Sequence, residues 1–151
     1  MLWMIGLAAL AAPLQPNAPG DLRVVGSEFL LIDERGGRAE VKPGDRVVHR
    51  PETSCYAWIV AVEPQARILR VREAFKLPAP ASHWGIDGAR AKVEQDGSGA
   101  VSEFDDDLSD GMITRSWCVS SGDPIGPHQI NVYAGDRLLG TFRFEVVAEA
   151  I

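Results

Sequence analysis

Basic residues are scarce in this chain of 151 residues, and their scarcity limits the partners it can have. Lysine and arginine number 15 against 21 aspartates and glutamates, which leaves a formal net charge of −6 at pH 7. Nucleic acids and anionic membrane surfaces are bound by clustered lysine and arginine side chains. No apolar run approaches the ~20 residues that a transmembrane helix needs. We therefore expect no nucleic-acid partner and no membrane span.

Sequence patterns typical of catalytic and metal sites are also missing. The three histidines, His49, His83 and His128, lie far apart, and no Cys-x-x-Cys pair occurs, whereas zinc sites usually include two closely spaced ligands. There is no glycine-rich phosphate loop and no nucleophile elbow. We predict a protein that is not an enzyme and has no cofactor. The alternative, a small hydrolase, requires a fold that brings His83 or His128 within hydrogen-bond reach of a carboxylate.

The first twelve residues contain no charged side chain and end in alanines, and proline-rich sequence follows them. An apolar run of this length, with Ala9-Leu10-Ala11 as a cleavage site, is typical of a secretory signal peptide, although no lysine or arginine precedes it. We predict a signal peptide over residues 1–12, a proline-rich linker over 13–22 and a single domain over 23–151, and therefore a periplasmic or secreted protein. The alternative is an N-terminal segment that packs on the core.

The rest of the chain alternates apolar and polar residues over short segments, as half-buried strands do. The strongest segment is 55–63, and residues 64–66 are expected to close a hairpin onto 68–75. Another hairpin tip is expected at 96–99, and three strands within 110–148 are expected to form a meander. Since 15 glycines and 10 prolines are available for turns, we predict an all-β fold, an antiparallel immunoglobulin-like β-sandwich of about seven to nine strands.

The last quarter of the chain carries a recognisable pattern of glycines and apolar residues. Residues 126–147 follow G-x-x-x-I-x-V-Y-x-G-D-x-L-x-x-x-x-x-F-x-V-x. This run resembles the closing hairpin of bacterial immunoglobulin-like and macroglobulin-like modules. The resemblance implies a sandwich fold and, by analogy, an adhesive or scaffolding role, and it carries no catalytic residues.

The chain has two cysteines, Cys55 and Cys118. In an exported protein, two cysteines most simply form one disulfide. Each lies on the less bulky side of its predicted strand, so a bridge can form if the two strands are neighbours in one sheet. On the loop-entropy model such a bridge would stabilise the fold by about 4 kcal/mol. The alternative is a pair of free thiols that behave as small apolar side chains.

A long loop rich in proline and glycine, residues 77–88, carries His83 and Trp84 side by side. An exposed tryptophan on such a loop can stack on a sugar ring or anchor a protein interface. The alternative is that the loop folds back and Trp84 plugs one end of the sandwich, since large aromatic side chains are mostly buried. Trp58 and Trp117 are expected in the core.

Acidic side chains are concentrated in a predicted loop over residues 105–111. Asp105, Asp107 and Asp110 are candidates for binding calcium together with backbone carbonyls. Residues 94–105 partly match a calcium-binding loop, but the glutamate at their first position and the aspartate at their last do not suit its geometry. Solvated turns are the alternative for both segments.

These observations favour an exported, non-catalytic immunoglobulin-like module that binds a protein partner in the cell envelope. The alternative is a sandwich that binds a small ligand or a carbohydrate through His83, Trp84 and the acidic loop, with or without calcium.

Overall fold

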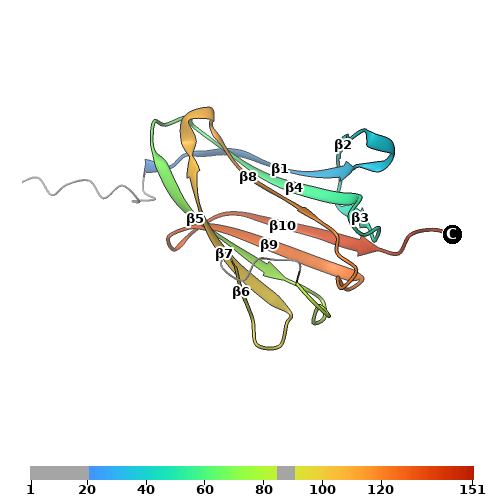
Figure 1. Cartoon of the computed structure of the whole chain (residues 1–151). Coiled ribbons are helices and arrows are strands. Elements are labelled where there is room, and N and C mark those ends of the chain that lie inside the picture. Colours follow the sequence, from blue (N-terminus) through green and yellow to red (C-terminus); the bar gives the residue numbers. More distant parts are fainter. Residues whose placement is uncertain (1–20, 85–90) are drawn as a thin grey trace, which may run out of the picture.

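Two layers of extended chain make up the fold. The computed structural model of the chain describes residues 21–84 and 91–151, and over these ranges it contains ten strands, short 3-10 turns and no α-helix (Figure 1). No helix in the described ranges is long and apolar enough to cross a membrane. The predicted signal peptide lies outside the described residues. Leu22, which belongs to the predicted linker, is buried, and its carbonyl accepts a hydrogen bond from Arg137.

The strands form a four-stranded sheet of order β2-β1-β4-β8 and a six-stranded sheet of order β3-β10-β9-β5-β7-β6. The predicted immunoglobulin-like sandwich is therefore confirmed. The strand count exceeds the expected range because several short strands lie at the sheet edges, and one of them, β3, pairs in parallel with β10. The strands are β1 (Val24–Asp33), β2 (Glu40–Pro43), β3 (Arg46–Val48), β4 (Ser54–Val62), β5 (Ile68–Lys76), β6 (Ala91–Val93), β7 (Gly99–Asp107), β8 (Met112–Cys118), β9 (Gly126–Ala134) and β10 (Arg137–Val147).

Two predicted strand pairings are wrong. β4 and β5 do not form a hairpin, because β4 lies between β1 and β8 while β5 lies between β9 and β7 in the other sheet. The expected C-terminal meander is also divided, since β8 pairs with β4 and only β9 and β10 form a hairpin. Alternation identifies the buried face of a strand, but both sheets bury a face against the same core, so alternation does not assign a strand to a sheet. The predicted β6–β7 hairpin with its tip at 96–99 is confirmed.

Aromatic side chains fill the core between the sheets. Phe29 on β1 stacks on Tyr56 with ring centroids 5.6 Å apart, and on Phe144 of β10 at 4.8 Å. Trp58 on β4 is fully buried and stacks on Phe142 at 5.8 Å. The contacts of Phe29 with Phe144 and of Trp58 with Phe142 cross from the smaller sheet to β10 of the larger one, so these aromatic residues hold the two layers together.

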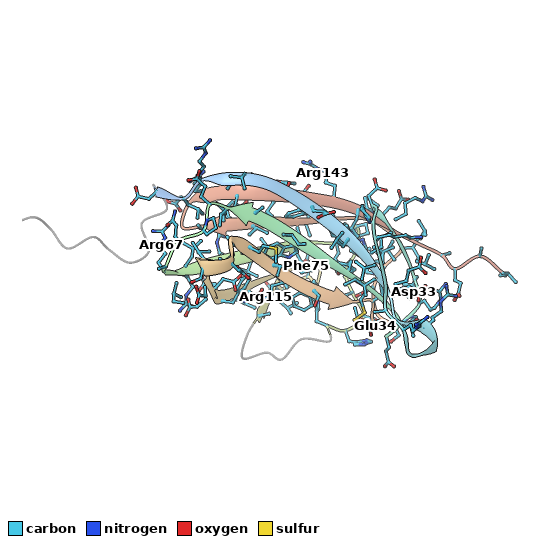
Figure 2. All side chains as sticks on the ribbon, turned by 90° about the horizontal axis from the view of Figure 1, so that it is seen from above. Asp33, Glu34, Arg67, Phe75, Arg115 and Arg143 are labelled. Carbon is cyan, nitrogen blue, oxygen red and sulfur yellow. A yellow bond between two sulfur atoms is a disulfide. The ribbon has the colours of Figure 1, made fainter. Side chains whose placement is uncertain are left out.

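The sheet edges are built in a way that disfavours pairing with another chain. β2, β3 and β6 have 4, 3 and 3 residues, which leaves β8 as the long edge of the smaller sheet. Arg115 on β8 points inward, with its guanidinium carbon 3.4 Å from the centroid of the Phe104 ring, and it donates to the Thr114 carbonyl at 2.6 Å (Figure 2). Short edges and inward-pointing charges are the devices by which native sheets avoid edge-to-edge association.

The outward faces of the two sheets differ in charge. On the larger sheet, β5 and β7 expose Arg70, Arg72, Glu103 and Asp105, and Arg143 projects from β10 (Figure 2). The outward face of the smaller sheet carries less charge. Among the outward-pointing positions of β1, β4 and β8 that pair across these strands, Glu28 is the one charged residue. The others are Gly26, Leu30, Ile32, Cys55, Ala57, Ile59, Ala61, Met112, Thr114, Ser116 and Cys118. The smaller sheet therefore presents the face that is easier to dehydrate on contact.

Candidate functional site

A cavity of about 410 Å³ opens at the end of the sandwich where β1, β5, β8 and β10 finish and β4 and β9 begin. We call it the end cavity. Its size is in the range of small-molecule sites. The residues that line it are Pro51, Glu52, Tyr56, Phe75, Leu77, His83, Trp84, Trp117, Cys118, Val119, Ser120, Ser121, Asp123 and His128. The fold therefore brings the predicted candidates His83 and Trp84 together with one of the two cysteines.

Backbone hydrogen bonds from the two residues before His83 fasten this segment to two neighbouring loops. Ala81 N–H donates to Gly97 at the β6–β7 hairpin tip at 3.1 Å, and Ser82 N–H donates to Gly122 in the β8–β9 loop at 3.2 Å. A side chain at position 122 would have no room, because a Cβ there would lie 2.7 Å from His83 Nδ1. The glycine thus allows the two loops to pack closely.

Two tryptophans flank Phe75 at the wall of the cavity. Trp84 and Trp117 each meet the Phe75 ring edge-on, with centroids 6.3 and 5.2 Å away. Trp84 is half-buried and packs against the core, and its indole N–H donates to the Gly97 carbonyl at 3.1 Å. Trp84 is therefore part of the end wall and at the same time lines the cavity. His83 is exposed at the rim.

The polar groups of the cavity come mainly from the loops that follow β3 and β8. Asp123 accepts hydrogen bonds from Ser120 N–H at 2.9 Å and from the Ser120 hydroxyl at 3.3 Å. Glu52 is exposed and adopts a φ of 69°, a conformation that is uncommon for residues other than glycine. Its N–H donates to Val119 at 2.9 Å, so this strained backbone holds Glu52 at the rim.

His128 on β9 lies at the base of the cavity and is 4% exposed. Its Nδ1 lies 2.9 Å from the Gly126 carbonyl, which requires a proton on Nδ1 and leaves Nε2 as an acceptor. Burial lowers the pKa of His128, and the bond to Gly126 and the charge of Asp123 oppose that shift only in part. Within the described residues Nε2 has no hydrogen-bond partner. His128 thus contributes a neutral imidazole with an unused lone pair.

Histidines and carboxylates do not combine into a catalytic arrangement. His49 Nε2 lies 3.1 Å from the Asp123 backbone carbonyl, and His128 also bonds a backbone carbonyl. Within residues 21–84 and 91–151, no histidine hydrogen-bonds a carboxylate, and no group of three or more His, Cys, Asp or Glu side chains could hold a metal ion. What the cavity offers chemically is a set of aromatic faces and hydrogen-bond acceptors.

A buried carboxylate that the sequence analysis overlooked lies behind the cavity wall. Glu73 on β5 is 0% exposed. Its Oε2 accepts the indole N–H groups of Trp58 and, at 3.1 Å, Trp117, and its Oε1 accepts the Ser102 hydroxyl at 3.1 Å. Burial raises the pKa of Glu73, and these hydrogen bonds and the charge of Arg115 oppose that rise. The sequence could have revealed this buried carboxylate, because Glu73 lies on the same face of the predicted strand as Leu69, Val71 and Phe75.

The two cysteines form the predicted bridge. Cys55 and Cys118 are directly opposite each other on β4 and β8, and their sulfur atoms are bonded. Cys55 is 3% exposed, whereas Cys118 is exposed and lines the end cavity. The bridge therefore ties the edge strand β8, which carries Trp117, to the centre of its sheet.

The acidic cluster is not the loop that was predicted. Asp105 and Asp107 lie on β7, and Asp110 ends a 3-10 turn over Leu108–Asp110. The Asp105 carboxylate pairs with Arg70 at 2.7 Å, Asp107 accepts from Ser109 N–H at 2.9 Å, and Asp110 accepts from Met112 N–H at 3.0 Å. Arginine pairing and turn capping therefore occupy these carboxylates, and they lie at the end of the sandwich opposite the end cavity.

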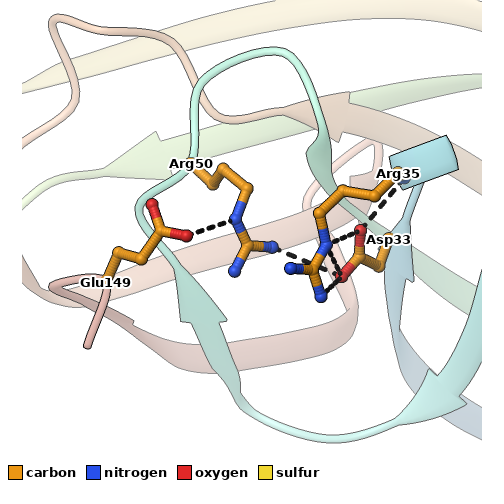
Figure 3. A network of polar contacts seen from close by, with 4 residues as sticks. All are labelled: Asp33, Arg35, Arg50 and Glu149. Atoms are coloured by element: carbon orange, nitrogen blue, oxygen red, sulfur yellow. Dashed lines mark hydrogen bonds and ion pairs between the residues drawn. The ribbon is translucent and has the colours of Figure 1, made fainter. Parts of the chain in front are cut away.

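A second polar network lies beside the cavity end of the sandwich (Figure 3). Arg50 connects Glu149, which follows β10, to Asp33 at the end of β1, with N–O distances of 2.8 and 3.3 Å. Arg35 also pairs with Asp33 at 2.8 Å, and its hydrogen bond lowers the pKa of Asp33. This network fastens the C-terminal segment to the smaller sheet.

Comparisons with known proteins agree on the architecture. A family model described as "PM0630 beta sandwich domain" matches residues 27–147. The chain is similar to the uncharacterized protein PM0630 of Pasteurella multocida (strain Pm70), with 24% identity over 122 residues that cover 79% of this chain and 76% of that protein. Its fold is similar to that of an immunoglobulin-like protein from Pseudomonas aeruginosa, with a TM-score of 0.53 and 15% identity, covering 86% of this chain and 99% of the other.

Proposed function

The chain belongs to the PM0630 beta sandwich domain family, and from this premise we propose that it is an exported, non-catalytic binding module whose ligand enters the end cavity. The observation that carries the proposal is the cavity itself. It has aromatic walls made by Trp84, Trp117 and Phe75 and a few polar groups at fixed positions. Such a combination is characteristic of ligand sites, in which apolar walls supply contact area and a few polar groups orient the ligand.

Export is supported by two independent features of the chain. The disulfide between Cys55 and Cys118 is a feature of proteins that fold in oxidising compartments such as the periplasm. The apolar, uncharged residues 1–12 have the composition of a secretory signal. Calcium binding by Asp105, Asp107 and Asp110 is left out of the proposal, because other groups of the protein already engage those carboxylates.

The test of the proposed site is a fluorescence titration of the full chain with a panel of glycans and small polar ligands. We expect at least one ligand to change the tryptophan emission of the wild type, because Trp84 and Trp117 both line the cavity. Trp84→Ala should weaken that ligand about tenfold or more, the usual effect of removing an aromatic anchor.

Tyr133→Ala is the matched control, since Tyr133 is an aromatic residue on the outward face of β9, where it stacks under Arg72 at 4.3 Å. The control should bind like the wild type. Equal loss in both variants, or ligand binding that ignores both substitutions, would place the site elsewhere and contradict the proposal.

A protein partner of the cell envelope is the second candidate, and the outward face of the smaller sheet favours it. That face carries Glu28 as its single charged residue among the paired positions of β1, β4 and β8, so an apolar protein surface could cover it at little electrostatic cost. A photo-crosslinking residue at Ile59, in the middle of this face, should then capture a defined partner in cells. The same residue at Arg72 on the charged face should capture none. Identical products from both positions would remove this candidate.

A further inference from the structure

From the proposed function we infer the class of ligand: the end cavity binds an organic cation, an ammonium or guanidinium group supplied by a free amine or by a basic side chain of another protein. The inference rests on the balance of charges, donors and acceptors at the lining residues. Among the described residues that line the cavity, Glu52 and Asp123 are the acidic side chains, and none is a lysine or an arginine.

Four hydrogen-bond donors of the cavity are engaged within the protein. The indole N–H of Trp84 donates to Gly97 and that of Trp117 donates to Glu73. The N–H and the hydroxyl of Ser120 both donate to Asp123. For an anionic ligand, which needs donors, the hydroxyls of Tyr56 and Ser121 and the ring of His83 would remain, without any positively charged lysine or arginine among the described lining residues.

Acceptors, by contrast, remain available. The Glu52 carboxylate is exposed at the rim, and the Asp123 carboxylate has acceptor sites left after accepting twice from Ser120. His128 is nine-tenths buried, lines the cavity and has an Nε2 lone pair without a partner in the described part of the chain. An unsatisfied buried acceptor is unfavourable, and a ligand that brings N–H groups would satisfy it.

The aromatic walls favour the same ligand. With their N–H groups bonded to the protein, Trp84 and Trp117 present their ring systems to the cavity, and the faces of such rings attract cations. Burial raises the pKa of Tyr56, and the negative charges of Asp123 and Glu73 add to that rise. A proton on Tyr56 thus experiences negative surroundings, as a cationic ligand would. A neutral sugar would also find acceptors and rings, but from the two carboxylates it would gain hydrogen bonds without the charge attraction that a cation gains.

Glu52 adds an argument from backbone strain. Its φ of 69° would suit glycine better, and side chains held in this conformation are frequently found at functional sites. If Glu52 serves the ligand, Glu52→Gly should raise the melting temperature by about 2–4 °C through relief of strain and at the same time weaken cation binding. A purely structural Glu52 would show the first change without the second.

The experiment is a calorimetric titration of the full-length chain with matched probes. Agmatine supplies a free guanidinium, and the blocked peptide acetyl-Gly-Arg-Gly-amide supplies the same group as part of a protein segment. The neutral counterpart is the same peptide with citrulline in place of arginine, and glucose represents neutral sugars. We expect one or both guanidinium probes to bind and the citrulline peptide to bind at least tenfold more weakly. Preference for agmatine would identify a free amine as ligand, and preference for the peptide a basic protein segment.

The variants are chosen to separate this inference from the proposed function. Glu52→Gln with Asp123→Asn keeps the shape of both side chains and leaves one amide oxygen to accept from the Ser120 N–H, and it should weaken guanidinium binding about tenfold for each carboxylate. If glucose or the citrulline peptide binds as tightly as the guanidinium probes and Trp84→Ala abolishes that binding, the cavity is a ligand site but the cationic class is wrong. If no probe binds in a Trp84-dependent manner, both the ligand class and the proposed site are contradicted.

Discussion

Replacing Glu73 with alanine should lower the free energy of unfolding by about 3–5 kcal/mol, one of the two largest effects that we expect from changes in this chain. Glu73 is fully buried on β5 and accepts the indole N–H groups of Trp58 and Trp117 and the hydroxyl of Ser102. Without the carboxylate, these donors lose their partner in a region from which water is excluded. Chemical denaturation monitored by circular dichroism measures the loss.

Glu73→Gln is the matched control, because its amide oxygen can still accept an indole N–H while the charge is gone. Burial raises the pKa of Glu73 above its ordinary value of 4.5. The folded protein therefore binds a proton more tightly than the unfolded chain does, and between the two pKa values the stability falls as pH rises. The wild type should lose stability relative to Glu73→Gln from about pH 4.5 upward. Parallel stability curves for the wild type and Glu73→Gln would contradict the raised pKa of Glu73. An alanine variant as stable as the wild type would show that the carboxylate is not needed as an acceptor.

Removing the disulfide should have a comparable effect. The bond joins residues that are 63 positions apart, and closing a loop of that length in the unfolded chain corresponds to about 4 kcal/mol, with measured losses for small domains of about 2–5 kcal/mol. A double variant, Cys55→Ala with Cys118→Ala, should therefore unfold at a clearly lower concentration of guanidinium chloride. Because β8 is an edge strand held to β4 by this bond, hydrogen exchange in β8 should also accelerate.

The wild type treated with a reductant provides the comparison for the double variant. Both lack the bond, so their unfolding midpoints should coincide within the small effect of exchanging two thiols for two methyl groups. A double variant that unfolds at the same midpoint as the oxidised wild type would mean that the smaller sheet is held by packing alone.

Much of the local structure could be read from the chain. The alternation of Tyr56, Trp58, Val60 and Val62 gives β4 one face that must be buried, and turn residues such as Gly97 separate the segments. The opposing alternation also placed Cys55 and Cys118 on less bulky positions, so a bridge between them could be anticipated. These features depend on the pleat of a strand, which repeats every two residues whatever the strand pairs with.

The sheet to which each strand belongs was decided by the tertiary structure. β4 and β5 each bury a face in the same core, and the chain satisfies both by crossing from one sheet to the other, which no local pattern distinguishes from a hairpin. Asp105 and Asp107 lie on β7 and not in the predicted loop, because the pairing of β7 with β5 extends as far as Asp107.

The sequence by itself predicted a β-sandwich, because strand alternation is a local property. The bridge between Cys55 and Cys118 also required β4 and β8 to be neighbours, which the tertiary structure decided. Only the tertiary structure determined that His83, Trp84, Trp117, His128 and Asp123 share one cavity. These residues come from separate loops and strands, and they meet because strands that finish and begin at the same end of the sandwich bring their connections together. The partners of Glu73 were decided in the same way, since its bonds to Trp58 and Trp117 cross between the sheets.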